Sequence, residues 1–212
     1  MPNQTNNRTN EFLEAAYSLE SDGDMQDFYS EWATEYDTQM EKELSYLSPS
    51  ITAKLLVQHQ PDRDSSLLDV GCGTGLTSVP LAAVGYATID GLDFSQAMLD
   101  QASARGFYRH LFQADLNKPL AIDTNSYDGA VCSGTFTHAH IGAEPLDEIF
   151  RVIKPGGHLV CTIHTHVWES GGFANKIAQL CESGTIVEVE RLQDAYFQGG
   201  EREGYFCVLK KC

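Results

Sequence analysis

The sequence is poor in basic residues and lacks the long apolar runs of membrane proteins. Lysine and arginine together number 14 against 30 aspartates and glutamates, which gives a net charge of −16 at pH 7. Because such a surface repels a phosphate backbone, nucleic acid is a poor candidate partner. No apolar run reaches the length of a membrane span, and the first ten residues lack the basic and apolar blocks of a signal peptide. We therefore expect a cytoplasmic protein with neither nucleic-acid nor membrane partners.

The six cysteines contain no CxxC pair, so neither a zinc site nor a dithiol redox motif is indicated. Cys132, Cys161 and Cys207 fall in apolar stretches that read as buried strands, and we expect no disulfides. Internal repeats are also absent from the sequence. A length of 212 residues suits one structural domain with a substantial core.

The most informative segment of the chain is residues 67–76, LLDVGCGTGL. An apolar strand pattern reaches Asp69, and glycines follow at Gly71, Gly73 and Gly75 before a helical pattern begins. Glycine permits left-handed backbone angles and lets a bound molecule lie directly against the main chain. The amides at the start of the following helix are free to meet a ligand. The segment therefore predicts a strand, a tight turn and a helix that together form a ligand site.

A second apolar stretch, residues 87–92, ends in Asp93. An acid at the tip of the second strand of a doubly wound sheet is positioned to accept the hydroxyls of a ribose. The dinucleotide-binding pattern would place its third glycine at Leu76, which argues against the alternative of a nicotinamide-dependent oxidoreductase. Asp69 would also repel a pyrophosphate, whereas it suits a ligand that carries cationic groups.

The D-x-G-x-G-x-G pattern of residues 69–75 resembles motif I of the class I methyltransferases, which bind S-adenosylmethionine. Three other segments carry the same resemblance: FYxxWAxxYD at residues 28–37, GLDFSQAML at 91–99 and RVIKPGG at 151–157. In particular they resemble the methyltransferase-like 27 group, whose substrate is poorly defined. The resemblance implies an α/β fold, a Rossmann-like doubly wound seven-stranded sheet that is mostly parallel and ends in an antiparallel C-terminal hairpin.

The hydrophobic pattern predicts elements that fit this fold. Strands are expected at residues 67–69, 87–93, 110–114, 127–133, 158–163, 186–190 and 205–210, and helices at 49–59, 76–84, 96–104, 144–152 and 168–183. We expect the helix at 49–59 to pack on the sheet edge and residues 154–157 to form a turn. The predicted organisation is a disordered tail at 1–10, an N-terminal helical lid at 11–60 and a class I methyltransferase core at 61–212, with lid and core in one structural domain.

The resemblance also implies where the cofactor would bind. Its amino acid end is expected over the glycine turn, with Asp69 in direct or water-mediated contact. Asp93 is expected to bind the ribose, Asp115 the adenine amino group, and Phe94 the adenine ring, although each could instead be an ordinary core or loop residue. The full set of predicted cofactor-binding residues is Tyr29, Trp32, Tyr36, Asp69, Gly71, Cys72, Gly73, Gly75, Asp93, Phe94, Met98, Asp115, Leu116 and Ser133.

Three aromatic residues ahead of motif I share one face of a predicted helix. Tyr29, Trp32 and Tyr36 follow each other at intervals of three and four residues. A stripe of this kind is often ordinary packing. The resemblance favours a second interpretation, in which the helix closes as a lid over cofactor and substrate.

Four histidines follow two strands whose carboxyl ends should meet at the ligand crevice. His138 and His140 come after the fourth strand, and His164 and His166 after the fifth. A general base is one interpretation, with His138 the first candidate and His140 and His164 the next. Exposed loop histidines are the alternative. No carboxylate or cysteine accompanies them at ligand spacing, so we predict no metal site.

Together these patterns predict a transferase that moves a methyl group from S-adenosyl-L-methionine to a small-molecule acceptor and releases S-adenosyl-L-homocysteine. A non-catalytic protein of the same fold, which holds the cofactor or its product without turnover, is the alternative. The acceptor atom, which can be oxygen, nitrogen, carbon or sulfur, and the oligomeric state are not encoded in any pattern that we recognise.

Overall fold

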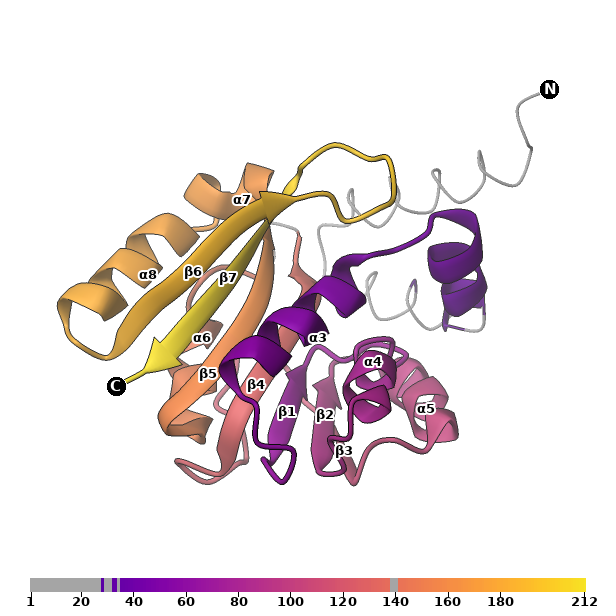
Figure 1. The fold of residues 1–212 in the computed structure, drawn as a ribbon, viewed down its shortest axis with the longest axis horizontal. Helices are drawn as coiled ribbons and strands as arrows, with labels where there is room; N and C mark the ends of the chain where they lie inside the picture. The colour runs from indigo at the N-terminus through magenta and orange to yellow at the C-terminus, as the bar shows by residue number, and fades with distance from the viewer. Residues whose placement is uncertain (1–27, 29–31, 34, 138–140) are drawn as a thin grey trace.

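The computed structural model describes residues 28, 32–33, 35–137 and 141–212. The predicted tail at 1–10 and the first part of the predicted lid lie outside these residues. The described chain forms one seven-stranded sheet with the strand order β3-β2-β1-β4-β5-β7-β6 (Figure 1). The strands are β1 Leu67–Val70, β2 Ile89–Asp93, β3 His110–Gln113, β4 Tyr127–Phe136, β5 Ile153–His164, β6 Ile186–Asp194 and β7 Gly204–Lys211.

Strands β1 to β5 pair in parallel, and β7 runs antiparallel to both β5 and β6. This arrangement confirms the predicted doubly wound sheet with an antiparallel C-terminal hairpin. The order changes direction at β1, because β2 and β3 lie on one side of it and β4 and β5 on the other. In an open parallel sheet the ligand crevice lies at such a reversal, beyond the carboxyl ends of the strands.

Helices cover both faces of the sheet (Figure 1). The helix α5 follows local sequence rules closely: the Ser95 side chain accepts a hydrogen bond from the Met98 amide at its start, and Gly106 ends it with φ of 72°. The helical elements are the π-helix η1 Thr38–Glu43, α3 Ser48–His59, α4 Ser78–Ala83, α5 Gln96–Arg105, α6 Pro145–Val152, α7 Thr165–Ser170 and α8 Phe173–Glu182.

The helix α3 packs on the face of the sheet, over β4 and β5, and the prediction that it lies at the sheet edge was wrong. Leu56 is fully buried in a cluster with Leu67, Val131 and Val160 from three neighbouring strands. The helix therefore covers the middle of the sheet, where continuous apolar strands need cover on both faces. The last part of the segment predicted as a lid thus contributes to the core.

Two other predicted elements differ from the structure. The single helix expected at 168–183 is divided into α7 and α8, because Gly172 adopts a left-handed φ of 78° that an α-helix cannot continue through. Strand β5 begins at Ile153 and includes residues 154–157, which were predicted as a turn. A register shift between β4 and β5 and a φ of 85° at Gly156 mark the irregular part of that strand.

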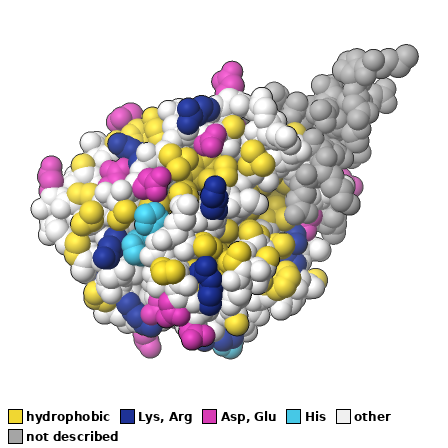
Figure 2. All heavy atoms as spheres, viewed as in Figure 1, with side chains coloured by type: hydrophobic (Ala, Val, Ile, Leu, Met, Phe, Trp, Pro, Cys, Tyr) yellow, Lys and Arg dark blue, Asp and Glu magenta, His cyan; other side chains and the backbone are white. Residues whose placement is uncertain are grey.

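The surface and the thiols agree with the composition. On the face drawn in Figure 2, acidic, basic and hydrophobic side chains are interspersed. All six cysteines are free, and Cys132, Cys161 and Cys207 are buried in the sheet. Among the helices that the structure describes, none is long and apolar enough to cross a membrane.

A substitution in α3 tests whether this helix stabilises the sheet. Leu56→Ala should lower the free energy of unfolding by about 2 to 5 kcal/mol, because it leaves a cavity above three strands. The exposed Lys54 lies on the same helix, and Lys54→Ala should change stability by less than about 0.5 kcal/mol. Denaturant unfolding measures both. Equal stability of the two variants would show that α3 contributes little to the core.

Candidate functional site

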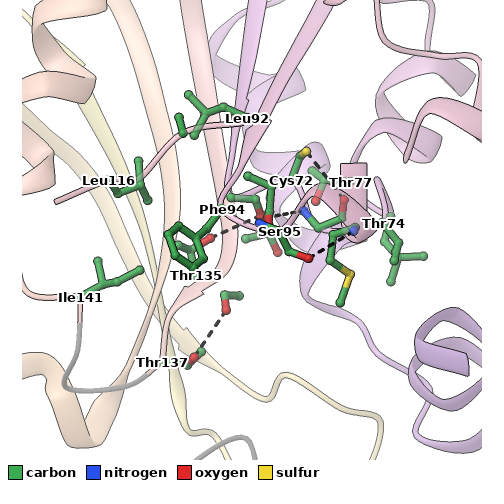
Figure 3. A pocket seen from close by; sticks show the side chains of 18 of the residues that line it. Cys72, Thr74, Thr77, Leu92, Phe94, Ser95, Leu116, Thr135, Thr137 and Ile141 are labelled. Atoms are coloured by element: carbon green, nitrogen blue, oxygen red, sulfur yellow. Dashed lines mark hydrogen bonds between the residues drawn. The ribbon is translucent and has the colours of Figure 1, made fainter. Parts of the chain in front are cut away.

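A cavity opens at the carboxyl ends of β1, β2 and β4, where the strand order reverses (Figure 3). In this view Cys72 and Thr74 of the glycine loop lie on one side of the cavity, and Leu116 and Ile141 lie on the other. The wall thus combines parts of the chain that are far apart in sequence. The predicted residues that line it are Tyr36, Gly71, Cys72, Gly73, Asp93, Phe94, Met98, Asp115, Leu116 and Ser133.

The glycine loop has the backbone that its sequence predicts. Gly71, Gly73 and Gly75 adopt φ angles of 67°, 53° and 88°. A Cβ added to Gly71 would lie 2.2 Å from Thr135 Oγ1, so this glycine lets the loop lie against β4. A Cβ added to Gly73 would meet nothing within 4 Å, and Gly73 lines the cavity. The bare backbone at Gly73 therefore leaves open space for a ligand.

Asp93 is held rigidly at the end of β2. One carboxylate oxygen accepts a hydrogen bond of 2.9 Å from the Gly73 amide, and the other accepts one of 2.9 Å from the Ser95 amide. Burial raises the pKa of Asp93, and hydrogen bonds from backbone amides oppose that effect in part. The carboxylate thus joins the glycine loop to the second strand at the cavity wall.

Asp115 follows β3 on the far side of the cavity. It accepts a hydrogen bond of 2.9 Å from the Asn117 amide and lies 2.9 Å from Lys118 Nζ. Burial raises the pKa of Asp115, but the contacts with Lys118 and Asn117 outweigh burial and hold the pKa below its usual value. Asp115 is therefore an ionised hydrogen-bond acceptor at neutral pH.

Asp69 lies beneath the glycine loop and does not line the cavity. Its Oδ2 accepts a hydrogen bond of 2.7 Å from the Tyr108 hydroxyl, while its Oδ1 is buried with no hydrogen-bond partner in the described structure. Burial raises the pKa of Asp69 to about 7. Gly75 also lies over Tyr108, since an added Cβ would be 2.9 Å from Tyr108 Cε2. Sequence reasoning missed Tyr108, which no motif marks.

The aromatic residues of the N-terminal segment reach the cavity in part. Tyr36 lines it, and Trp32 packs edge-on behind Tyr36 with ring centroids 4.7 Å apart. Trp32 is buried, and its indole nitrogen donates a hydrogen bond of 2.5 Å to Gln39 Oε1. Tyr29 lies outside the described residues. Tyr36 is therefore the described member of the predicted stripe that a ligand in the cavity would meet.

Asp37 ties this N-terminal segment to the glycine loop. Its carboxylate accepts a hydrogen bond of 2.5 Å from Thr74 Oγ1 and another from the Arg105 guanidinium. Arg105 also donates a hydrogen bond of 2.6 Å from Nε to the Thr74 carbonyl. The three residues come from a helix, a loop and the end of α5, and only their positions in the fold bring them together.

Of the three candidate bases, His164 is among the described residues. His164 does not line the cavity: its Nδ1 accepts a hydrogen bond of 3.3 Å from the His166 amide and so caps α7. Burial lowers the pKa of His164 to about 4. His138 and His140 lie outside the described residues. The described residues contain no group of three or more side chains arranged to hold a metal ion.

Several lining residues were not anticipated from the sequence. Tyr46 precedes α3 and Pro49 lies in its first turn, and Thr135, Thr137 and Ile141 extend the cavity beyond Ser133. Of the last group only Thr135 belongs to β4, which continues to Phe136, so a longer predicted strand would have included Thr135 alone. Tyr46 carries no comparable signal in the sequence.

Comparison with known proteins relates this chain to methyltransferases. Residues 68–161 match a protein family described as "Methyltransferase domain". The human protein "Methyltransferase-like protein 27" is 34% identical over 142 residues, which cover 66% of this chain and 57% of that protein. The "O-methyltransferase cnsE" of Penicillium expansum is 26% identical over 158 residues, which cover 71% of this chain and 56% of that protein. The chain thus spans little more than half the length of these relatives.

The fold has relatives among solved structures. The crystal structure of an S-adenosylmethionine-dependent methyltransferase from Mesorhizobium loti superposes with a TM-score of 0.57 at 17% identity, over 74% of this chain and 96% of that chain. Residues 68–161 therefore match a methyltransferase domain, and the chain has the fold of that solved structure, which confirms the resemblance drawn from motif I. The family match and the fold imply S-adenosyl-L-methionine as the cofactor. The likeness of this chain to methyltransferase-like protein 27 agrees with the predicted group.

The buried Asp69 predicts a specific dependence of stability on pH. Because its folded-state pKa of about 7 exceeds the usual 3.8, the folded state binds the proton more tightly than the unfolded chain does. The stability from this proton is full below about pH 3.8 and is lost as the pH rises to about 7. Asparagine does not titrate. The free energy of unfolding of Asp69→Asn, relative to the wild type, should therefore rise by at least about 1 kcal/mol from pH 4 to 7.

Denaturant unfolding across that pH range provides the measurement. Asp123→Asn removes one carboxylate from an exposed loop and controls for the change in net charge. Wild type and Asp69→Asn curves that stay parallel across the range would contradict the raised pKa of Asp69.

Proposed function

We propose that the protein transfers a methyl group from S-adenosyl-L-methionine to a small-molecule acceptor. The observation that carries this proposal is that one cavity gathers the glycine loop, the acid at the end of β2, the acid after β3 and the end of β4. The comparisons support the coarser statement, since the chain carries a methyltransferase domain. The acceptor class is our inference from the cavity and from the surface charge.

Two observations indicate that the cavity fits this cofactor. The space beside Gly73 lets a ligand lie against the main chain. The buried Oδ1 of Asp69 beneath the loop has no partner in the described structure, so it can accept a hydrogen bond from a bound water or from a cationic group. Acidic residues suit a ligand that carries an ammonium and a sulfonium. In this interpretation Asp93 accepts the ribose hydroxyls, and Asp115 accepts the adenine amino group.

In methyl transfer the main task of the protein is to position the cofactor and the acceptor. The cofactor supplies an electrophilic methyl group on its sulfonium, and the acceptor must approach in line with the bond that breaks. Rigid groups serve this purpose: Asp93 is fixed by two backbone amides, and the glycine loop is fixed against β4 at Gly71. Tyr36 lines the cavity, and the hydrogen bond from Thr74 to Asp37 holds the neighbouring backbone on the glycine loop. Tyr36 would therefore be the part of the lid that covers the ligand.

Small acceptors agree with the charge of the molecule. The net charge of −16 opposes binding of a nucleic acid backbone. The relative from Penicillium expansum is named an O-methyltransferase, which makes a hydroxyl acceptor a reasonable first choice for a screen. A hydroxyl must lose its proton during the transfer, so this choice also calls for a general base.

We propose His138 as that base. Thr137 and Ile141, the described residues on either side of the 138–140 segment, both line the cavity. His164 has its Nδ1 engaged by a backbone amide and is a less suitable candidate. The imidazole would take the proton from the acceptor as the methyl group is transferred.

The cofactor is tested by calorimetric titration with S-adenosylmethionine and, in parallel, with NAD. The wild type should bind S-adenosylmethionine in a saturable manner, and Asp93→Asn should weaken binding at least about tenfold, because a charged hydrogen-bond acceptor is lost. Asp100→Asn removes an exposed acid from α5 and should bind as the wild type does. Tighter binding of NAD, or unchanged affinity in Asp93→Asn, would overturn the assignment.

Turnover is tested by the release of S-adenosylhomocysteine with a panel of hydroxylated small molecules. His138→Gln should lower the rate by about 10² to 10⁴ at unchanged affinity for S-adenosylmethionine. His164→Gln is the matched variant and should retain most of the rate. The reverse pattern would assign the base to His164, and unchanged turnover of His138→Gln at every pH would remove His138 from the mechanism. Cofactor binding without turnover for any acceptor would instead favour the non-catalytic alternative.

A further inference from the structure

Tyr46 forms part of the cavity wall that no motif predicted. Its ring packs against Phe197 with centroids 5.2 Å apart, and its backbone forms an isolated bridge with Phe197. Its amide donates a hydrogen bond of 2.9 Å to the Met40 carbonyl. These contacts fix both ends of the residue, so the position of the hydroxyl is determined by the fold and not by a free rotamer.

The hydroxyl of Tyr46 lies against the end of β4. Ser48 and Ser133 are neighbours whose hydroxyls lower the pKa of this phenol, and their own hydroxyl oxygens are 3.1 Å apart. A Cβ added to Gly134 would lie 2.5 Å from this hydroxyl, which shows how closely it approaches the backbone there. Tyr46, Ser133 and Gly134 all line the cavity. The phenol is thus one member of a hydroxyl cluster on the cavity wall.

This cluster lies beside the glycine loop. Strand β4 pairs directly with β1, and Thr135 of β4 is in contact with Gly71 of the loop. The part of a cofactor that lies over the loop therefore also lies near the end of β4. For S-adenosylmethionine that part is the amino acid end, which carries a carboxylate as well as an ammonium.

The carboxylate of such a ligand needs hydrogen-bond donors in an acidic cavity. The charged side chains among the described lining residues are Asp93 and Asp115, and no lysine or arginine lines the cavity in the described part of the chain. Among the described lining residues, the side chains that can donate a hydrogen bond to this carboxylate are therefore uncharged. Burial raises the pKa of Tyr46, so its hydroxyl keeps its proton at neutral pH.

We infer that the Tyr46 hydroxyl, positioned by the ring packing on Phe197 and by its close approach to Gly134, donates a hydrogen bond to the carboxylate of bound S-adenosylmethionine. The inference rests on the proposed function, because it assumes that cofactor in the cavity. Tyr46 acts as a cofactor-positioning residue: it fixes the amino acid end and thereby the direction of the sulfonium methyl group.

A cycle of two proteins and two ligands tests this role. S-adenosylmethionine and its decarboxylated analogue are titrated calorimetrically into the wild type and into Tyr46→Phe. The variant should bind S-adenosylmethionine about tenfold more weakly, because a hydrogen bond to a charged group is lost, and should bind the decarboxylated analogue within about twofold of the wild type. Phenylalanine keeps the ring packing on Phe197, and retained binding of the analogue reports an intact cavity.

Tyr205→Phe removes a phenol hydroxyl on β7 that does not line the cavity and lies next to Trp168, and this variant should bind both ligands as the wild type does. Equal weakening of both ligands in Tyr46→Phe, or no weakening of either, would overturn the role of Tyr46. Failure of the proposed function has a different signature, because the wild type itself would then bind neither ligand.

Discussion

The hydrogen bond from the Gly73 amide to Asp93 is the interaction on which the candidate site depends. It joins the loop after β1 to the end of β2 across 2.9 Å. The loop can reach Asp93 because Gly73 adopts a φ of 53°, which a residue with a Cβ adopts only with strain. Gly71 fixes the other side of the loop against Thr135. A short, bare loop held on two strands therefore forms the floor of the cavity.

Another part of the wall is supplied by the N-terminal segment, which is itself bonded to the glycine loop. Asp37 is bonded to Thr74 in the loop and to Arg105 at the end of α5, and Tyr46 rests against the end of β4. The helix α3 that follows is buried on the sheet. The segment is thus anchored at Asp37 and again at Tyr46, and its residues Tyr36 and Tyr46 line the cavity.

The sequence alone predicted those features of the fold that depend on interactions within a few residues. The end of β2 at Asp93, the glycine positions and the cap residues Ser95 and Gly106 follow from backbone sterics and hydrogen bonding within a few residues, and the structure agrees with them. The contacts of Asp37, Tyr46 and Tyr108 join segments that are distant in sequence. No periodicity or spacing encodes such contacts, because they arise only after the sheet has assembled. The division between α7 and α8 could have been predicted from the sequence, because the adjacent Gly171 and Gly172 disfavour a continuous helix.

The three acids around the cavity are held in different electrostatic states, and this difference bears on the proposed reaction. Asp115 is compensated by Lys118, Asp93 is held by backbone amides, and burial raises the pKa of Asp69 to about 7. The negative potential of the site at neutral pH therefore varies with the protonation of Asp69. A sulfonium cofactor gains from this potential, whereas its product has lost the sulfonium charge. Methyl transfer would thus itself weaken the attraction that holds the ligand, which favours release of the product.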